Sequence, residues 1–319
     1  MGSGIWSTDV YDAADRYRRA TGKSAFSYSD SGARTVHPAL DPRGVVRESR
    51  DSAEHPESTA IAVLFDVTGS MGHVPRVLQT KLPQLLGLLL RQGYARDPQI
   101  MFGAIGDATC DRVPLQIGQF ESDNRMDDDL GRIVLEGGGG GQMTESYELA
   151  LYFMARHTVT DCWEKRGRRG YLFIIGDELA YPRVKAREVA RRIGDDLRED
   201  LPVRQIVDEV TRRWDTYYLL PAGSAYAGNR QVLDFWRGLL GQHAVELDDL
   251  DAVCETIALT VGLGEQAIDL DEGLRDLDRA GSTAGRTVSR ALARLDGGRR
   301  TSVAALPFTP TDGSGGTRR

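Results

Sequence analysis

Short, continuously apolar runs alternate along the chain with longer segments in which apolar residues recur every three or four positions. The clearest run, residues 61–65, is too short for a helix and is mostly β-branched or aromatic. Such a run predicts a strand buried on both faces of a parallel sheet. Six strands are predicted, at residues 61–65, 99–106, 113–120, 171–177, 216–220 and 244–247. The one at residues 113–120 is predicted from alternating apolar positions, which fit an edge strand.

Segments with helical periodicity separate and follow these strands. They cover residues 74–92, 127–135, 146–155, 184–197, 203–214, 230–240 and 250–262. Alternation of strands and helices on this scale predicts an α/β fold, a doubly wound, mostly parallel, six-stranded Rossmann-like sheet with helices on both faces. Pro114 is tolerable only in an edge strand, which is predicted to run antiparallel to its neighbour.

The two ends of the chain have a different pattern from this 58–267 domain. Residues 1–57 carry little apolar periodicity, apart from a short helix at residues 9–19 with Thr8 as its N-cap. They form either an N-terminal arm that packs along the domain or a disordered tail. Residues 268–298 are predicted as a helical extension with charged helices at 270–280 and 287–295, and residues 299–319 as a disordered tail.

Composition narrows the class of protein. The net charge of −7 and the isoelectric point near 5.4 give no global basic field that would favour nucleic acid. The three cysteines are far apart and lack metal-ligand spacing, which suggests a reducing compartment. No apolar segment follows Met1, and the longest apolar stretch, residues 85–90, is far too short to span a bilayer. We therefore expect a cytoplasmic protein that binds neither nucleic acid nor membranes.

Polar side chains follow two of the predicted central strands. Asp66, Thr68 and Ser70 come directly after the first strand, and Asp177 ends the fourth. The carboxyl ends of strands in an open α/β sheet face the crevice where ligands bind. Carboxylates and hydroxyls form an all-oxygen set that suits a hard cation such as Mg²⁺ rather than Zn²⁺. The simpler alternative is a polar strand end whose hydroxyls cap the next helix.

A run of five glycines at residues 137–141 leads into the helix predicted at residues 146–155. Glycines allow close backbone approach and positive φ values, which favours a site loop over a flexible linker. His73, Asp107, Asp111 and Glu178 could lie at the rim of the same crevice, although rim residues are usually only solvated.

The pattern Asp66-x-Thr68-x-Ser70 after an apolar strand resembles the metal-ion-dependent adhesion site, or MIDAS, of von Willebrand factor A (vWA) domains, whose motif is Asp-x-Ser-x-Ser. The resemblance covers about residues 58–265 and implies the Rossmann-like vWA fold. The family adds an Asp from the fourth strand, which matches Asp177, and a Thr from a second loop. Counting back from the Ala-Leu pair of the following helix places Glu145 at that Thr position.

The second-loop ligand therefore stays open between Glu145 and its neighbours Thr144 and Ser146. A ligating Glu145 would put three carboxylates around one divalent ion. The extra negative charge would tighten cation binding and weaken the capture of an acidic residue from a partner.

The resemblance implies metal-dependent protein binding without catalysis. Mg²⁺, or alternatively Mn²⁺ or Ca²⁺, would leave an open coordination position for an Asp or Glu of the protein partner. Similar bacterial proteins often work as adaptors with AAA+ ATPases, which makes such an ATPase a candidate partner by analogy.

The alternative is a haloacid dehalogenase-like, Mg²⁺-dependent phosphohydrolase with Asp66 as the nucleophile. The family's second Asp, its general acid/base, is Thr68 here, and threonine cannot transfer protons near neutral pH. The carboxylate expected shortly after Asp177 is also missing. No P-loop, His-Glu-x-x-His or dinucleotide-binding glycine motif is present in the sequence.

Overall fold

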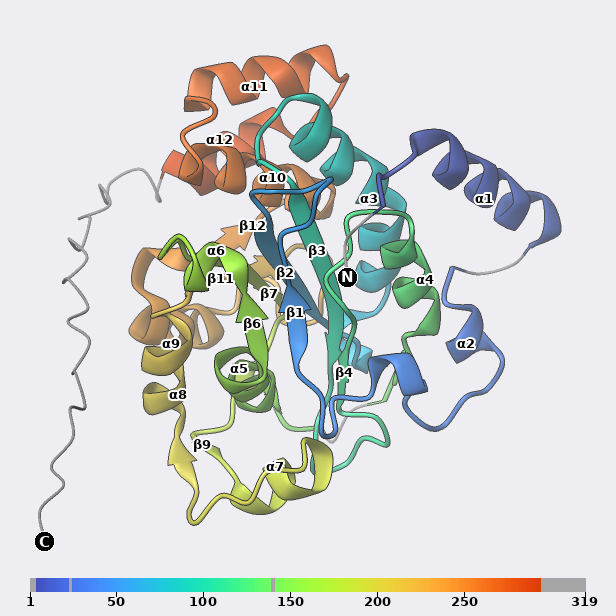
Figure 1. Ribbon diagram of the computed structural model, residues 1–319. Coiled ribbons are helices and arrows are strands. Elements are labelled where there is room, and N and C mark those ends of the chain that lie inside the picture. The colour runs from blue at the N-terminus through green and yellow to red at the C-terminus, as the bar shows by residue number, and fades with distance from the viewer. Residues whose placement is uncertain (1–3, 23–24, 139–140, 294–319) are drawn as a thin grey trace, which may run out of the picture.

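The central element of the computed structural model, which describes residues 4–22, 25–138 and 141–293, is a six-stranded sheet (Figure 1). Its strands are β2 (Thr59–Asp66), β3 (Pro98–Ile105), β4 (Leu115–Ile117), β7 (Gly170–Ile175), β11 (Trp214–Pro221) and β12 (Ala244–Leu247). They lie in the order β12-β11-β7-β2-β3-β4, and all neighbours are parallel except β3 and β4. The prediction of a mostly parallel six-stranded sheet with an antiparallel edge strand is confirmed.

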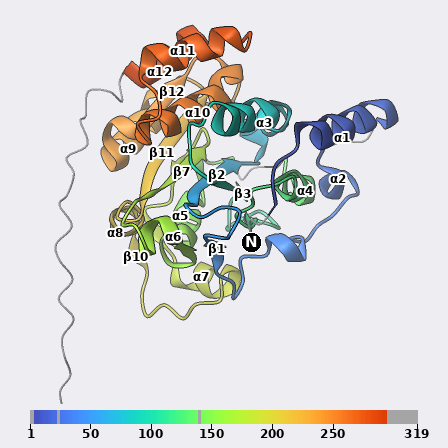
Figure 2. The same cartoon turned by 45° about the horizontal axis from the view of Figure 1, so that its top comes forward.

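The central strands are buried along their whole length because both faces of the sheet are covered. Alternate residues of β2 enter two separate cores, Ile61 and Val63 on one face and Ala62 and Leu64 on the other. Figure 2 shows helices on the two sides of the sheet. The first core includes residues of α3 (Val74–Arg91), α4 (Arg125–Arg132) and α10 (Val253–Gly264). The second includes residues of α5 (Tyr147–Arg156), α7 (Ala186–Arg192), α8 (Val203–Val210) and α9 (Arg230–Leu240).

The strand order fixes where a ligand site is expected. Numbered along the chain, the six strands lie in the order 3-2-1-4-5-6, the arrangement of a doubly wound sheet. The order reverses between β2 and β7, which are hydrogen-bonded neighbours. The carboxyl ends of these two strands, which carry Asp66 and Asp177, therefore meet at the switch point.

Within the described residues, three two-stranded pairings lie outside the main sheet, and none of them was predicted from the sequence. In the first, β1 (Arg47–Ser49) runs parallel to β6 (Thr158–Thr160). In the second, β5 (Thr144–Glu145) runs parallel to β8 (Leu179–Ala180). The third joins β9 (Arg183–Val184) to β10 (Leu201–Pro202) in antiparallel orientation. Two or three residues carry too little periodicity to be recognised as strands.

The described part of residues 1–57 packs on the domain, so the disordered-tail alternative does not hold for it. Tyr11 of α1 (Thr8–Thr21) is buried in the first core, and its hydroxyl donates to the carbonyl oxygen of Gln79 at 3.1 Å. The prediction of Thr8 as the N-cap was wrong. Ser7 occupies that position, because its hydroxyl accepts from the backbone N–H of Val10. The remaining short helices are α2 (Ser27–Asp30), α6 (Asp161–Glu164) and the 3-10 turns η1 (Pro38–Leu40), η2 (Gly69–Met71), η3 (Gly241–His243) and η4 (Leu250–Ala252).

The C-terminal extension forms two helices, α11 (Leu270–Arg279) and α12 (Gly285–Ala293), beside α10 (Figure 2). Leu277, Val288 and Leu292 are buried in the same core as α3 and α10. The predicted tail, residues 299–319, lies outside the described residues. No helix in the described ranges combines the length and apolarity needed to cross a membrane.

Two of the predicted helices extend beyond the observed ones. The helix predicted at residues 203–214 ends at Val210, because Trp214 already belongs to β11 and pairs with Gly170 of β7. The helix predicted at residues 184–197 is confined to α7.

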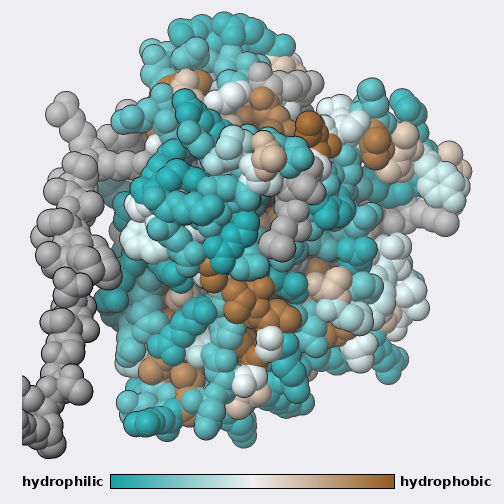
Figure 3. Space-filling view, in the orientation of Figure 1, coloured by the Kyte–Doolittle hydropathy of each residue, from teal (hydrophilic) through white to brown (hydrophobic). Residues whose placement is uncertain are grey.

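The face shown in Figure 3 is mainly hydrophilic. The most exposed large apolar side chain among the described residues is Ile5, at 75%, in the N-terminal segment.

Candidate metal centre

Asp66 ends β2 and begins a continuous chain of oxygen atoms. Its Oδ1 accepts from the backbone N–H of Thr68 at 2.8 Å and from the Thr68 hydroxyl at 2.6 Å. The Thr68 hydroxyl lies 3.2 Å from the hydroxyl of Ser70, which donates to Asp177 Oδ1 at 2.8 Å. The structure thus brings together all four residues that the sequence predicted from the first and third loops.

Burial places two carboxylates in this chain without a compensating positive charge. Asp66 and Asp177 are both 0% exposed. Burial, with a smaller contribution from the charge of Asp177, raises the pKa of Asp66 to about 7. Burial also raises the pKa of Asp177. No Lys, Arg or His of the described ranges forms an ion pair with either residue. A bound cation would supply the missing charge.

The donor set fits a hard divalent cation by its chemistry, since two carboxylates and two hydroxyls offer only oxygen. Within the part of the chain that the structure describes, no group of three or more His, Cys, Asp or Glu side chains could hold a metal ion. Ser70 is partly exposed, whereas Asp66, Thr68 and Asp177 are buried. Solvent or a ligand would therefore approach the chain of oxygens from the side of Ser70.

The second-loop candidates lie in β5 and at the start of α5. Glu145 is 2% exposed, and its Oε2 has no hydrogen-bond partner. Burial raises the pKa of Glu145 to about 11, and the charge of Asp66 is the next cause. Without a cation, Glu145 is therefore a neutral acid near neutral pH. The hydroxyl of Ser146 already has a partner, because it accepts from the backbone N–H of Ala108, after β3, at 2.9 Å. Thr144 is partly buried.

Replacing Glu145 by threonine is expected to weaken Mg²⁺ or Mn²⁺ binding, whereas Thr144→Ala is expected to do less. A carboxylate attracts a divalent ion far more than a hydroxyl does, even at an effective dielectric constant of about 20. Because the pKa of Glu145 is raised to about 11, its ligation would also release a proton. Calorimetry in buffers of different ionisation enthalpy measures both effects. An isotherm that Glu145→Thr leaves unchanged would exclude Glu145 as a ligand.

The glycine-rich loop contacts the first loop through its backbone. The N–H of Gly69 donates to the carbonyl oxygen of Gly138 at 2.6 Å, and the N–H of Gly137 donates to that of Val67 at 3.3 Å. A Cβ atom on Gly69 would lie 3.0 Å from the Gly138 oxygen. This close approach fits the interpretation as a site loop; residues 139 and 140 lie outside the described ranges.

Two partners of the carboxylates were missed by the sequence analysis. The hydroxyl of Tyr147, a fully buried residue in the first turn of α5, donates to Asp66 Oδ2 at 2.6 Å. The backbone N–H of Tyr226, in the loop after β11, donates to Asp177 Oδ2 at 3.0 Å. A buried tyrosine needs a partner for its hydroxyl, which is the one signal that could have indicated Tyr147.

The predicted rim residues differ in their surroundings. Glu178 is 4% exposed, and burial followed by the charges of Asp66 and Asp177 raises its pKa to about 8. Asp107 belongs to a separate network, because its Oδ2 accepts hydrogen bonds from the side chains of Thr109 at 2.7 Å, Gln142 at 2.5 Å and Tyr181 at 3.1 Å. Asp111 accepts from the backbone N–H of Asp107. His73 is exposed.

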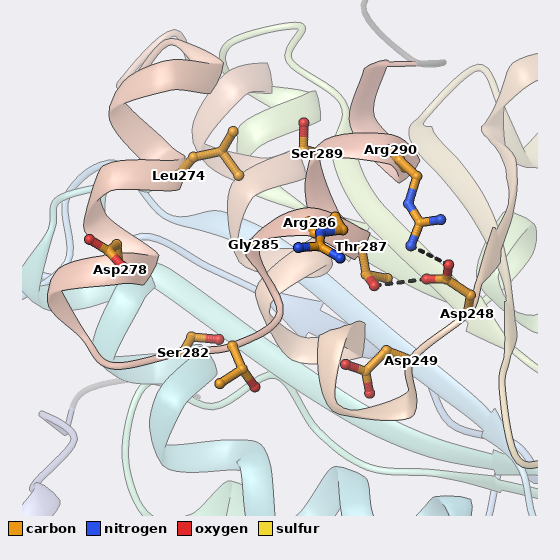
Figure 4. Close-up of a pocket in the computed structure, with 11 residues that line it drawn as sticks. Asp248, Asp249, Leu274, Asp278, Ser282, Gly285, Arg286, Thr287, Ser289 and Arg290 are labelled. Carbon is orange, nitrogen blue, oxygen red and sulfur yellow. Dashed lines mark hydrogen bonds and ion pairs between the residues drawn. The ribbon is translucent and has the colours of Figure 1, made fainter.

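A cavity of about 900 Å³ lies elsewhere, between α11, α12 and the loop that follows β12 (Figure 4). None of the predicted site residues lines it. Its carboxylate Asp248 already accepts from the Thr287 hydroxyl at 2.7 Å and forms an ion pair with Arg290. The site residues predicted from the sequence therefore lie at the switch point of the sheet and not in this cavity.

No protein-family model matches the chain, and no curated protein matches it. Similar solved structures include the pilus adhesin SpaC of Lactobacillus rhamnosus GG in an open conformation, with 9% identity, a TM-score of 0.45, and coverage of 73% of this chain and 31% of the adhesin. Another is proximal thread matrix protein 1 from the mussel byssus, with 8% identity, a TM-score of 0.44, and coverage of 68% and 48%. The chain thus spans less than half of either protein, and similarity at this level supports no statement about function.

Proposed function

We propose that the protein is a vWA-like, metal-ion-dependent protein-binding module that carries no catalytic activity of its own. The observation that carries this proposal is the unbroken chain of oxygens from Asp66 through Thr68 and Ser70 to Asp177. These residues match the MIDAS positions of the first and third loops, with Thr68 in place of the first serine, and they lie at the switch point of the sheet. Mg²⁺, Mn²⁺ or Ca²⁺ would be held there by oxygen ligands.

The partner would complete the coordination of the ion from the side of Ser70, with an Asp or Glu side chain. If Glu145 stays protonated and does not ligate the ion, it does not repel an incoming carboxylate, whereas a ligating Glu145 would weaken this capture. Partner binding would then depend on the metal ion held by the first loop, because without this ion the partner's acidic group has no positive charge to bind. An AAA+ ATPase remains a candidate partner by analogy with similar bacterial proteins.

The phosphohydrolase alternative gains no support from the surroundings of Asp66. A nucleophilic carboxylate needs an oxygen that can reach the phosphorus atom. Both oxygens of Asp66 accept hydrogen bonds, and the residue is fully buried. The neighbouring Thr68 offers no group that transfers protons near neutral pH.

The proposal predicts that Mg²⁺ or Mn²⁺ binds the purified protein in calorimetry and that protein partners are captured only when the ion is present. Capture should be lost in EDTA, restored by excess Mg²⁺, and absent with Asp177→Asn, which removes one charge from the ion's surroundings. Asp107→Asn is the matched control, because Asp107 lies outside the chain of oxygens. Capture that is insensitive to EDTA would contradict the proposal. Hydrolysis of an aryl phosphate that disappears with Asp66→Asn would favour the enzyme instead.

A further inference from the structure

The carboxylates of Asp66 and Asp177 are held in similar ways. In each, Oδ1 accepts from a hydroxyl of the first loop, and Oδ2 accepts from another part of the protein. Asp66 directs Oδ1 to Thr68, while its Oδ2 accepts from Tyr147 at 2.6 Å. Asp177 directs Oδ1 to Ser70, while its Oδ2 accepts from the N–H of Tyr226 at 3.0 Å. A cation that replaced the hydroxyl hydrogen bonds would therefore meet Oδ1 of each carboxylate, while the protein keeps its hydrogen bonds to both Oδ2 atoms.

The Tyr147 hydroxyl has little freedom to leave Asp66. Its ring is fully buried and packs edge-on against Tyr218, with centroids 6.0 Å apart, and against Trp236, with centroids 5.5 Å apart. On another side, a Cβ atom at Gly176 would lie only 2.1 Å from the Tyr147 hydroxyl oxygen. Gly176 precedes Asp177, so the backbone of the third loop also confines this hydroxyl.

The geometry of one-oxygen contact discriminates between divalent ions. Ca²⁺ takes six to eight oxygen ligands and often binds both oxygens of a carboxylate, whereas Mg²⁺ demands near-octahedral coordination and keeps several waters. Two-oxygen binding by Asp66 would displace the Tyr147 hydroxyl from Oδ2 and deprive this buried hydroxyl of its hydrogen bond to Asp66. Unpaired buried polar groups are costly, so this mode is disfavoured.

We propose that Tyr147 is a positioning residue that holds Asp66 in one-oxygen contact and thereby makes the site prefer Mg²⁺ or Mn²⁺ to Ca²⁺. This inference rests on the proposed metal site and adds the choice of ion to it. Tyr147 does not touch the ion; it acts through the orientation of Asp66.

The test is calorimetric titration of the purified protein with Mg²⁺, Mn²⁺ and Ca²⁺, for wild type and Tyr147→Phe. Removing only the hydroxyl frees Asp66 Oδ2 and should raise the affinity for Ca²⁺ relative to Mg²⁺ by about tenfold or more. Tyr152→Phe is the matched control. Tyr152 is another buried tyrosine of α5, and its hydroxyl donates to Asp195 Oδ2 at 2.6 Å and not to Asp66. The ratio of affinities should not change in this control.

The outcomes separate this inference from the proposed function. A wild-type protein that binds none of the three ions would contradict the metal site itself. Binding with the same Mg²⁺-to-Ca²⁺ ratio in wild type and Tyr147→Phe would overturn the role of Tyr147 alone. If Tyr147→Phe does not fold, a crystal structure of the wild type with Mn²⁺ decides. Tyr147 within hydrogen-bond distance of a one-oxygen Asp66 would support the role, and two-oxygen binding by Asp66 would overturn it.

Discussion

Replacement of Asp66 by asparagine is expected to abolish Mg²⁺ and Mn²⁺ binding while raising the melting temperature of the metal-free protein at about pH 8. The loss of binding follows from Coulomb attraction, which for unit charges 4 Å apart is about 4 kcal/mol at an effective dielectric constant near 20. At about 1.4 kcal/mol for each tenfold change, this corresponds to a reduction in affinity of roughly 1,000-fold. Calorimetry measures the affinity, and thermal denaturation in EDTA measures the stability.

The gain in stability has a defined sign and pH window. Burial raises the pKa of Asp66 to about 7 in the folded protein, above the value of about 3.9 for an unfolded aspartate. Between these values the folded state holds a proton that the unfolded state has released, so stability falls as the pH rises. Asparagine does not titrate and escapes this loss. The variant's advantage should therefore be greatest at about pH 8 and vanish near pH 4.

A melting temperature about 3 °C or more above that of the wild type would be a clear gain for a chain of this size. The control is Asp66→Asn in the presence of excess Mg²⁺. There the wild type should regain its stability through ion binding while the variant does not respond. A variant that binds Mg²⁺ as well as the wild type, or that loses stability at every pH, would contradict the assignment of Asp66.

Gly176→Ala is expected to destabilise the protein by about 3 kcal/mol, at the upper end of the usual cost of overpacking a core. The added methyl would lie 2.1 Å from the Tyr147 hydroxyl oxygen and within 2.8 Å of two ring carbons. The ring of Tyr147 has little room to move away from the added methyl, because Tyr218 and Trp236 pack against it. Thermal or urea denaturation measures the change, and a weaker metal affinity should accompany it since Tyr147 would be displaced from Asp66.

Gly238→Ala is the matched comparison. Gly238 lies within α9, and a Cβ atom there would meet nothing within 4 Å. Alanine is preferred to glycine inside a helix by roughly 0.5–1 kcal/mol, so this variant should be slightly more stable than the wild type. Equal stabilities of the two alanine variants would show that the third loop tolerates a side chain at position 176, and that Tyr147 is not confined as described.

The sheet and half of the site could be predicted because their signals are local in the sequence. Residues 61–65 and 171–175 are continuous apolar runs, and burial on both faces requires that pattern. Once these strands are placed in parallel, Asp66 and Asp177 must lie at the same edge. The convergence of the two carboxylates thus follows from strand direction alone. The binding of a metal at this point stays a prediction.

The remaining half of the site depends on contacts that no local pattern encodes. Tyr147 reads in the sequence as one more apolar residue of a buried helix, and only its position opposite Gly176 brings its hydroxyl to Asp66. Tyr226 contributes a backbone N–H, which any residue other than proline would carry. The helix N-cap at Ser7 instead of Thr8 is a smaller error, since both residue types cap helices well.

The pairing of β5 with β8 has a consequence for how the site would respond to an ion. Thr144 pairs with Leu179 and Glu145 with Ala180, so the second and third loops are joined by backbone hydrogen bonds into one unit. A cation that drew Glu145 toward Asp66 would also move Leu179 and Ala180. Linkage is reciprocal. If the ion changes the affinity for a partner that binds the segment after Ala180, that partner would change the affinity for the ion by the same factor. The ion and a surface outside its coordination shell would then be thermodynamically coupled through two residue pairs.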